Sequence, residues 1–139
     1  MRAIATVALL TTPILLAACG PATESTPEPL TEKQAKVMDR ELKGRVAGTP
    51  QNCIPTYNSD GLVRVSDSIL IYKPGGVVYV NNLKGSCPGL ASDSDIIVTQ
   101  SYGSQTCDGD LIKLVDRSSG IQGPVCSLGQ FVPYKKPKG

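Results

Sequence analysis

From residue 53 onward, short apolar segments alternate with turn-forming residues. The apolar segments are rich in β-branched side chains and cover residues 62–65, 68–72, 77–80, 96–100, 111–115 and 125–132. Such segments are typical of half-buried strands. Lys73-Pro74-Gly75-Gly76 separates two of them, where Pro presets φ and Gly allows the positive φ that a hairpin needs. Because the connections are too short for crossover helices, the pattern predicts a mainly β domain over 45–134, as a small antiparallel sheet or open barrel.

Residues 31–44 carry a helical pattern. Thr31 and Gln34 are spaced as a capping box. Three apolar residues fall on one face of this segment: Ala35, Met38 and Leu42. Because this apolar stripe is narrow, we expect one N-terminal α-helix that packs lightly against the β domain. A stalk that docks a partner is the alternative.

The first residues show a different pattern. A basic residue at position 2 precedes an apolar run over residues 3–16, and Leu16-Ala17-Ala18-Cys19 closes it. This arrangement is typical of a secretory signal peptide. The run is too short, and too interrupted by Thr and Pro, for a membrane-spanning helix, which needs ~20 apolar residues. An ordinary secreted protein is one interpretation of this pattern.

The closing Cys favours another interpretation, because the segment resembles the bacterial lipobox. The resemblance implies removal of residues 1–18 as a lipoprotein signal peptide and acylation of Cys19 with fatty acids such as palmitate. Two acyl chains already hold a protein stably on a membrane, at ~0.8 kcal/mol per buried CH₂. The resemblance further implies the periplasmic leaflet of the outer membrane, because the second mature residue is Gly20 rather than Asp. Residues 19–30 are rich in Pro, Thr and Glu and are expected to be a disordered tether.

Four Cys remain after Cys19. They are Cys53, Cys87, Cys107 and Cys126. An even number in an oxidising compartment predicts two disulfides. Three pairings are open, and we favour Cys87–Cys107, which brackets one apolar strand, with Cys53–Cys126. A four-Cys zinc site would need close Cys-x₂₋₄-Cys pairs, and these Cys lie at least nineteen residues apart.

The composition excludes several kinds of chemistry. The chain has no His, so it can hold neither a Ser-His-Asp nor a Cys-His catalytic pair, nor a His-ligated metal. Its 14 Lys and Arg nearly balance 12 Asp and Glu, and a formal net charge of +2 gives no steering field for nucleic acid. No phosphate-binding glycine motif occurs. We therefore assign no catalytic, cofactor-binding or metal-ligating residue and expect no cofactor.

Two Asp-x-Asp pairs are the remaining candidates for chemistry. They are Asp93 with Asp95, and Asp108 with Asp110. Such pairs can ligate Ca²⁺ or supply an acid–base couple. Asp is also common in turns, because its side chain accepts hydrogen bonds from nearby backbone N–H groups. We favour the turn role and keep cation binding and catalysis as alternatives.

Tyr residues and a basic tail are the other candidate binding features. The five Tyr are Tyr57, Tyr72, Tyr79, Tyr102 and Tyr134. We expect Tyr72 and Tyr79 to pair across the predicted hairpin, and favour sheet packing over a sugar- or peptide-binding surface. Residues 135–139 contain three Lys and are expected to be a solvated tail. Weak contact with anionic lipid is the alternative for this tail.

The spacing and surroundings of the Cys carry a family resemblance. The motifs are Cys53-Ile54, Cys87-Pro88-Gly89-Leu90, Cys107-Asp108-Gly109-Asp110 and Cys126-x-Leu128-Gly129. They resemble a family of proteobacterial envelope proteins that have an export signal and a β-rich domain of unknown function. The resemblance covers about residues 45–134. It supports two disulfides and implies no catalytic or binding residue.

These observations predict a lipid-anchored envelope protein that is a non-enzymatic binding or structural module. Its expected partners are the membrane, through lipidated Cys19, and an envelope protein or the cell wall. The alternative is an inhibitor of a cell-wall hydrolase such as lysozyme, which needs an exposed loop that enters an active-site cleft. Lys84-Gly85-Ser86 and Arg117-Ser118-Ser119 are the candidate loops. A hydrolase that uses the Asp pairs is the third hypothesis.

Overall fold

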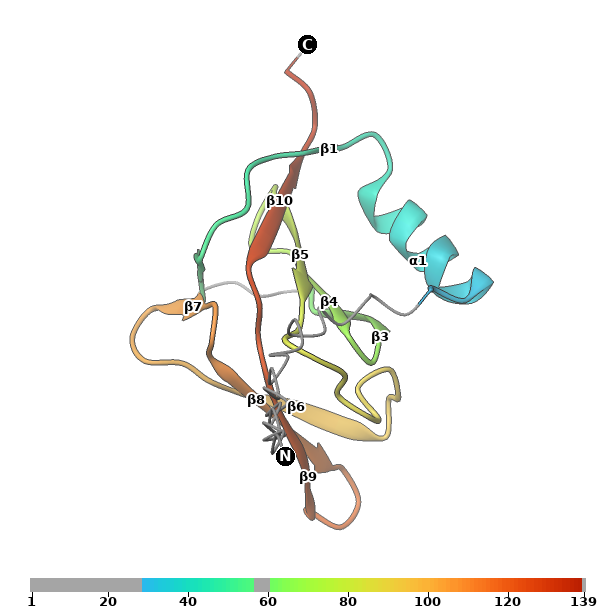
Figure 1. Ribbon diagram of the computed structural model, residues 1–139, viewed down its shortest axis with the longest axis vertical. Helices are drawn as coiled ribbons and strands as arrows, with labels where there is room; N and C mark the ends of the chain where they lie inside the picture. Colours follow the sequence, from blue (N-terminus) through green and yellow to red (C-terminus); the bar gives the residue numbers. More distant parts are fainter. Residues whose placement is uncertain (1–28, 57–60, 139) are drawn as a thin grey trace, which may run out of the picture.

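The computed structural model of the chain describes residues 29–56 and 61–138. The predicted signal peptide, Cys19 and most of the tether lie outside these residues, as does Tyr57. The described part has one helix and ten strands (Figure 1). Their bounds are α1 Glu32–Leu42, β1 Val46–Ala47, β2 Cys53–Pro55, β3 Val63–Ser66, β4 Ile69–Tyr72, β5 Val78–Asn82, β6 Asp95–Gln100, β7 Gln105–Cys107, β8 Leu111–Asp116, β9 Gln122–Ser127 and β10 Phe131–Lys135.

The strands form three antiparallel sheets. The largest has the order β1-β10-β5-β4-β3, the second the order β6-β8-β9, and the third pairs β2 with β7. The sheets do not close into a barrel. The predicted mainly β architecture with one N-terminal helix is therefore confirmed. Within the described residues, no helix is long and apolar enough to cross a membrane.

The β4–β5 hairpin forms where its turn residues predict it. Gly75 has a φ of 69°, a backbone conformation that Gly adopts at no steric cost. Tyr72 lies directly opposite Tyr79 in the ladder, and both side chains are buried. The Tyr72 ring meets Phe131 edge-on, with 5.5 Å between the centroids. The predicted Tyr pair is thus confirmed, and these two rings contribute to the core.

The helix begins as its sequence predicts. Thr31 and Gln34 form a complete capping box, in which each side chain bonds the main chain of the other residue. Met38 and Leu42 pack against the five-stranded sheet, together with Leu30 at the end of the predicted tether. The Glu41 carboxylate also accepts a hydrogen bond from Lys73 in the β4–β5 turn, at 3.0 Å. These contacts hold α1 against one face of the sheet.

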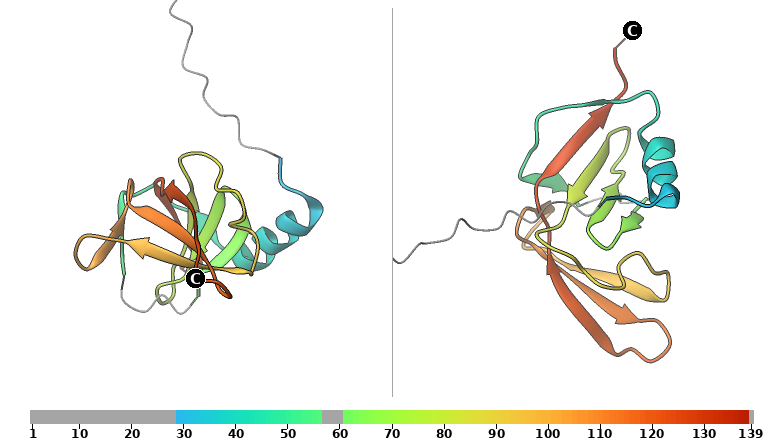
Figure 2. Two further views of the ribbon diagram at one scale, coloured as in Figure 1. Left: turned by 90° about the horizontal axis from the view of Figure 1, so that it is seen from below. Right: turned by 45° about the vertical axis from the view of Figure 1, so that its right-hand side comes forward.

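The five-stranded sheet is covered on both faces, as the two views of Figure 2 show. Helix α1 covers the face that carries Val65, Ile71, Val78 and Val80. The opposite face carries Leu70, Tyr72 and Phe131, which pack against the inward side chains of the β6-β8-β9 sheet. Ile112 and Leu114 of β8 are fully buried there. The main core is thus formed between two sheets.

The predicted single strand over 125–132 is wrong. Residues up to Ser127 belong to β9, and Phe131 begins β10 in a different sheet. Between them, the amide of Leu128 donates to the carbonyl of Asp110 at 2.9 Å. The main chain of Gly129 bonds the buried side chain of Asn81 in β5. These tertiary contacts redirect a continuous apolar segment from one sheet to the other.

All four predicted Cys form disulfides, but the favoured pairing is wrong. The bridges are Cys53–Cys107 and Cys87–Cys126, rather than Cys87–Cys107 and Cys53–Cys126. Cys53 and Cys107 lie directly opposite each other in the β2–β7 ladder, with Cα atoms 4.0 Å apart. Cys126 lies opposite Ile112 of β8, whose side chain faces the core, where Cys87 is fully buried. The ladders therefore decide the pairing.

Candidate functional site

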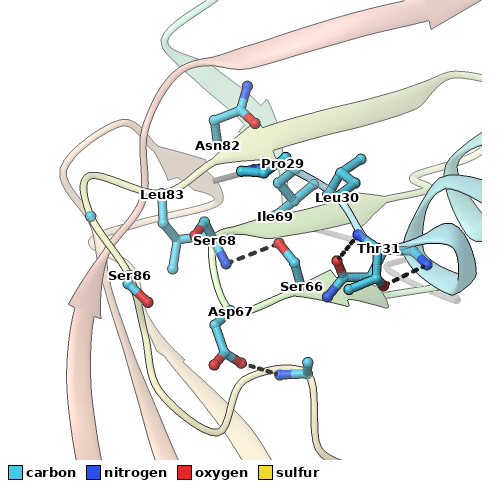
Figure 3. A pocket seen from close by; sticks show the side chains of 13 residues that line it. Pro29, Leu30, Thr31, Ser66, Asp67, Ser68, Ile69, Asn82, Leu83 and Ser86 are labelled. Carbon is cyan, nitrogen blue, oxygen red and sulfur yellow. Dashed lines mark hydrogen bonds between the residues drawn. The ribbon is translucent and has the colours of Figure 1, made fainter. Parts of the chain in front are cut away.

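A groove lies where the start of α1 meets the β3–β4 turn (Figure 3). Its volume is about 490 Å³. Leu30, Ile69 and Leu83 supply the apolar part of the lining. Hydroxyl and amide side chains supply most of the polar part: Thr31, Gln34, Ser66, Ser68, Asn82 and Ser86. Segments from three parts of the sequence therefore meet at this groove.

Hydrogen bonds fix the β3–β4 turn to the segment that follows β5. The side-chain carboxylate of Asp67 accepts a hydrogen bond from the amide of Ala91 at 3.0 Å. The main-chain carbonyl of Asp67 accepts one from the amide of Cys87 at 2.7 Å. The amide of Leu83 donates to the carbonyl of Ser68 at 2.9 Å. The Cys87 disulfide then ties the same segment to β9. The β3–β4 turn and the segment after β5, which form two walls of the groove, are therefore held to each other.

The groove favours an uncharged ligand with hydroxyl or amide groups. Among the described residues that line it, Asp67 has the one charged side chain. Its other polar groups are donors and acceptors that exchange hydrogen bonds with sugars or peptide groups. The apolar side chains offer contact to a ring face or a methyl group. Nothing in the sequence pattern predicted this set, because the β3–β4 turn and α1 meet only in the folded chain.

The Asp108–Asp110 pair performs structural roles. Asp108 forms an ion pair with Lys84, at 2.6 Å between Oδ1 and Nζ. The Asp110 carboxylate accepts from the amide of Cys107 at 2.8 Å and closes the turn between β7 and β8. This hydrogen bond gives Asp110 the predicted turn role. No group of three or more His, Cys, Asp or Glu in the described part of the chain is arranged to hold a metal ion.

The Asp93–Asp95 pair lies at the start of β6, apart from the groove lining. The carbonyl of Asp95 accepts a hydrogen bond from the Arg64 guanidinium of β3. The carboxylate of Asp95 accepts a hydrogen bond from the hydroxyl of Ser94 at 3.5 Å. Asp93 is exposed beside β3. These contacts connect the two sheets at this corner.

Four hydrogen bonds to Asp116 hold the turn between β8 and β9. One carboxylate oxygen of Asp116 accepts from the amides and hydroxyls of both Ser118 and Ser119, at 2.6 to 3.0 Å. The Ser118 hydroxyl, followed by the donors of Ser119, holds the pKa of Asp116 well below its ordinary value. Arg117 is exposed in the same turn. Of the two predicted loops, this one presents a cation on an ordered backbone.

The other predicted loop and the remaining candidates lie elsewhere. Gly85 and Ser86 line the groove, while the Lys84 side chain pairs with Asp108. Burial raises the pKa of Tyr72, so its phenol stays neutral inside the core. Tyr102 is 97% exposed in the β6–β7 connection. Lys135 ends β10, so the predicted tail begins inside the last strand.

Comparisons with protein-family models, with curated proteins and with solved structures find no match to this chain.

Proposed function

We propose that this chain is a lipid-anchored protein of the cell envelope that binds a cell-wall component without catalysing a reaction. The groove between α1 and the β3–β4 turn is the observation that supports this proposal. Its volume of about 490 Å³ accommodates one or two sugar or amino-acid units. Its hydroxyl and amide groups match the acetamido, hydroxyl and peptide groups of peptidoglycan. Asp67 can accept from one further donor of the ligand.

The proposed lipid anchor is tested by replacing Cys19, the residue expected to be acylated. Cys19→Ala is expected to abolish incorporation of radiolabelled palmitate into the full-length chain and to remove the protein from the membrane fraction. The matched control is Ser25→Ala in the predicted tether, which leaves the sulfur in place. Unchanged labelling and unchanged membrane retention of Cys19→Ala would contradict the lipobox interpretation.

Cell-wall binding is tested by co-sedimentation of the full-length chain with purified peptidoglycan. Ser86→Trp places a large side chain at the groove, and is expected to reduce the bound fraction at least tenfold. Gln122→Trp is the matched control, because Gln122 is also solvent-exposed, on β9, and does not line the groove. Equal sedimentation of all three proteins would show that the groove is not the binding site. The absence of sedimentation of the wild-type chain would refute cell-wall binding.

The β8–β9 turn favours a second candidate function, inhibition of a cell-wall hydrolase. Glycosidases of this class use two carboxylates in a cleft, and an exposed cation on an ordered turn is complementary to such a cleft. Arg117 is that cation, and the Asp116 carboxylate accepts from the amides of the two residues that follow it. In a lysozyme assay with the full-length chain, Arg117→Ala should lose inhibition while Lys33→Ala, an exposed cation on α1, retains it. Full lysozyme activity in the presence of excess wild-type chain would rule this function out.

A further inference from the structure

Within the described part of the chain, main-chain groups along one edge of strand β6 have no partner beyond Asp95. The carbonyl of Ser94 accepts from the amide of Arg117, which follows β8. Since consecutive residues of a strand direct their N–H and C=O groups to opposite edges, Ile97 and Thr99 direct theirs away from β8. Among the described residues, none exchanges a hydrogen bond with the main chain of Ile97 or Thr99 at that outer edge. The carbonyl of Asp95, on the same edge, is occupied by Arg64.

This edge lacks the features by which the other outer strands avoid pairing. At the opposite edge of the same sheet, β9 contains Gly123 and Pro124, and its ladder with β8 is irregular. At the edges of the large sheet, β1 has only two residues and β3 carries a register shift. In contrast, all six residues of β6 pair with β8 in one continuous register. β6 also contains neither Pro, Gly nor Lys. Such an unprotected edge is a template for another strand.

We propose that β6 pairs antiparallel with β6 of a second copy of this chain, about a twofold axis. A row of unpaired N–H and C=O groups is complementary to another extended strand with the same row free. A second β6 supplies that row over the same length. Two copies would then share one continuous six-stranded sheet of order β9-β8-β6-β6-β8-β9.

The side-chain alternation restricts the register of this pairing. Ile96 and Val98 are each 41% exposed on the outer face, and a shift by one residue would exchange the two faces. The axis must therefore pass through a residue position, and Ile97 and Val98 are the two central residues of β6. An axis at Ile97 would need the carbonyl of Asp95, which Arg64 already occupies. An axis at Val98 pairs Ile97 with Thr99 of the second copy on both sides, which gives four main-chain hydrogen bonds.

The charges are compatible with this register. Val98 lies opposite its own copy, Ile96 opposite Gln100, and Asp95 opposite Ser101. No charged residue of β6 therefore faces a like charge. The two Asp95 side chains lie six residues apart along the ladder, about 20 Å at ~3.4 Å per residue. The exposed apolar side chains of the two outer faces become neighbours across the axis, which favours a second copy over a charged partner.

The pairing is tested by sedimentation equilibrium of the full-length chain in mild detergent, from about 10 µM to about 1 mM, because an edge-to-edge contact buries less than a standard interface. The wild-type chain is expected to show a monomer–dimer equilibrium. Val98→Lys places two like charges opposite each other on the axis and should weaken the dimer at least tenfold. Val125→Lys is the matched control, since Val125 is 50% exposed on the same sheet at its far edge.

A wild-type chain that stays monomeric over this range would refute the proposal. Equal weakening by Val98→Lys and Val125→Lys would also refute it, because the apolar face rather than the β6 edge would then form the contact. Amide hydrogen exchange of the wild-type chain needs no variant. Exchange at Ile97 and Thr99 should slow as the chain concentration rises, while exchange at Leu114 in the central strand stays constant. Concentration-independent exchange at Ile97 and Thr99 would contradict strand pairing.

Discussion

Replacement of Gly129 by Ala is expected to destabilise the protein by about 3 kcal/mol. A Cβ at this position would overlap the main-chain carbonyl oxygen of Asn82, which cannot rotate away as a side chain could. Separation of the two segments costs ~1–3 kcal/mol, as overpacking does in other cores. The same movement stretches two hydrogen bonds between Gly129 and the fully buried Asn81 amide, of 2.6 and 3.2 Å. Each such bond contributes ~1 kcal/mol.

Thermal unfolding followed by circular dichroism measures this loss. For a domain of this size, 3 kcal/mol corresponds to a decrease in Tm of roughly 10 °C. Gly123→Ala is the control, because a Cβ there would meet no heavy atom closer than 3.4 Å. It should change the stability by less than ~1 kcal/mol. If the two variants had the same Tm, the close approach of Gly129 to β5 would not be a rigid feature of the fold, and the reasoning would fail.

Three further predictions follow from single contacts. Replacement of both Cys87 and Cys126 by Ala opens a loop of 39 residues and should cost about 4 kcal/mol in denaturant unfolding, whereas an unchanged midpoint would argue against this pairing. The hydrogen bond from Lys73 lowers the pKa of Glu41 below its ordinary value of 4.5, so the ion pair stabilises the fold above that pH and its contribution disappears as pH falls through the lowered pKa. Glu41→Gln should therefore cost less than ~1 kcal/mol at pH 7 and nothing at the lowest pH, and an equal cost at both would contradict this origin. Asp110→Ala should cost ~1–3 kcal/mol, because it leaves the amide three residues earlier without its acceptor, and a neutral effect would show that water replaces the carboxylate.

The groove illustrates why sequence alone gave no binding site. Its lining combines Leu30, the neighbouring Ser66 and Asp67, and Asn82, which come from three separate segments of the chain with no shared spacing. Main-chain hydrogen bonds join the β3–β4 turn to the segment after β5, and apolar packing places Leu30 against the same sheet. Asp108 and Asp110, which the sequence did single out, instead form an ion pair and close a turn. The type of a residue shows which chemistry its side chain could perform. Whether it belongs to a binding site depends on which segments the sheets place side by side.

The sequence by itself determined the features that depend on neighbouring residues. The capping box of α1, the Pro74-Gly75 hairpin turn and the Tyr72–Tyr79 pair all involve residues within a few positions of one another. Local dihedral preferences and side-chain alternation are sufficient to predict them. The parity of the Cys likewise predicted two disulfides before their partners were known.

The tertiary structure decided what depends on segments far apart in the chain. β2 and β7 have three residues each, too few for an apolar period, yet their ladder sets the Cys53–Cys107 bridge. The division of the apolar segment 125–132 between two sheets follows from the approach of Gly129 to β5. Closing the loop between two distant segments costs entropy, and only the packing between the two segments offsets that cost. Neither segment's own sequence specifies this packing.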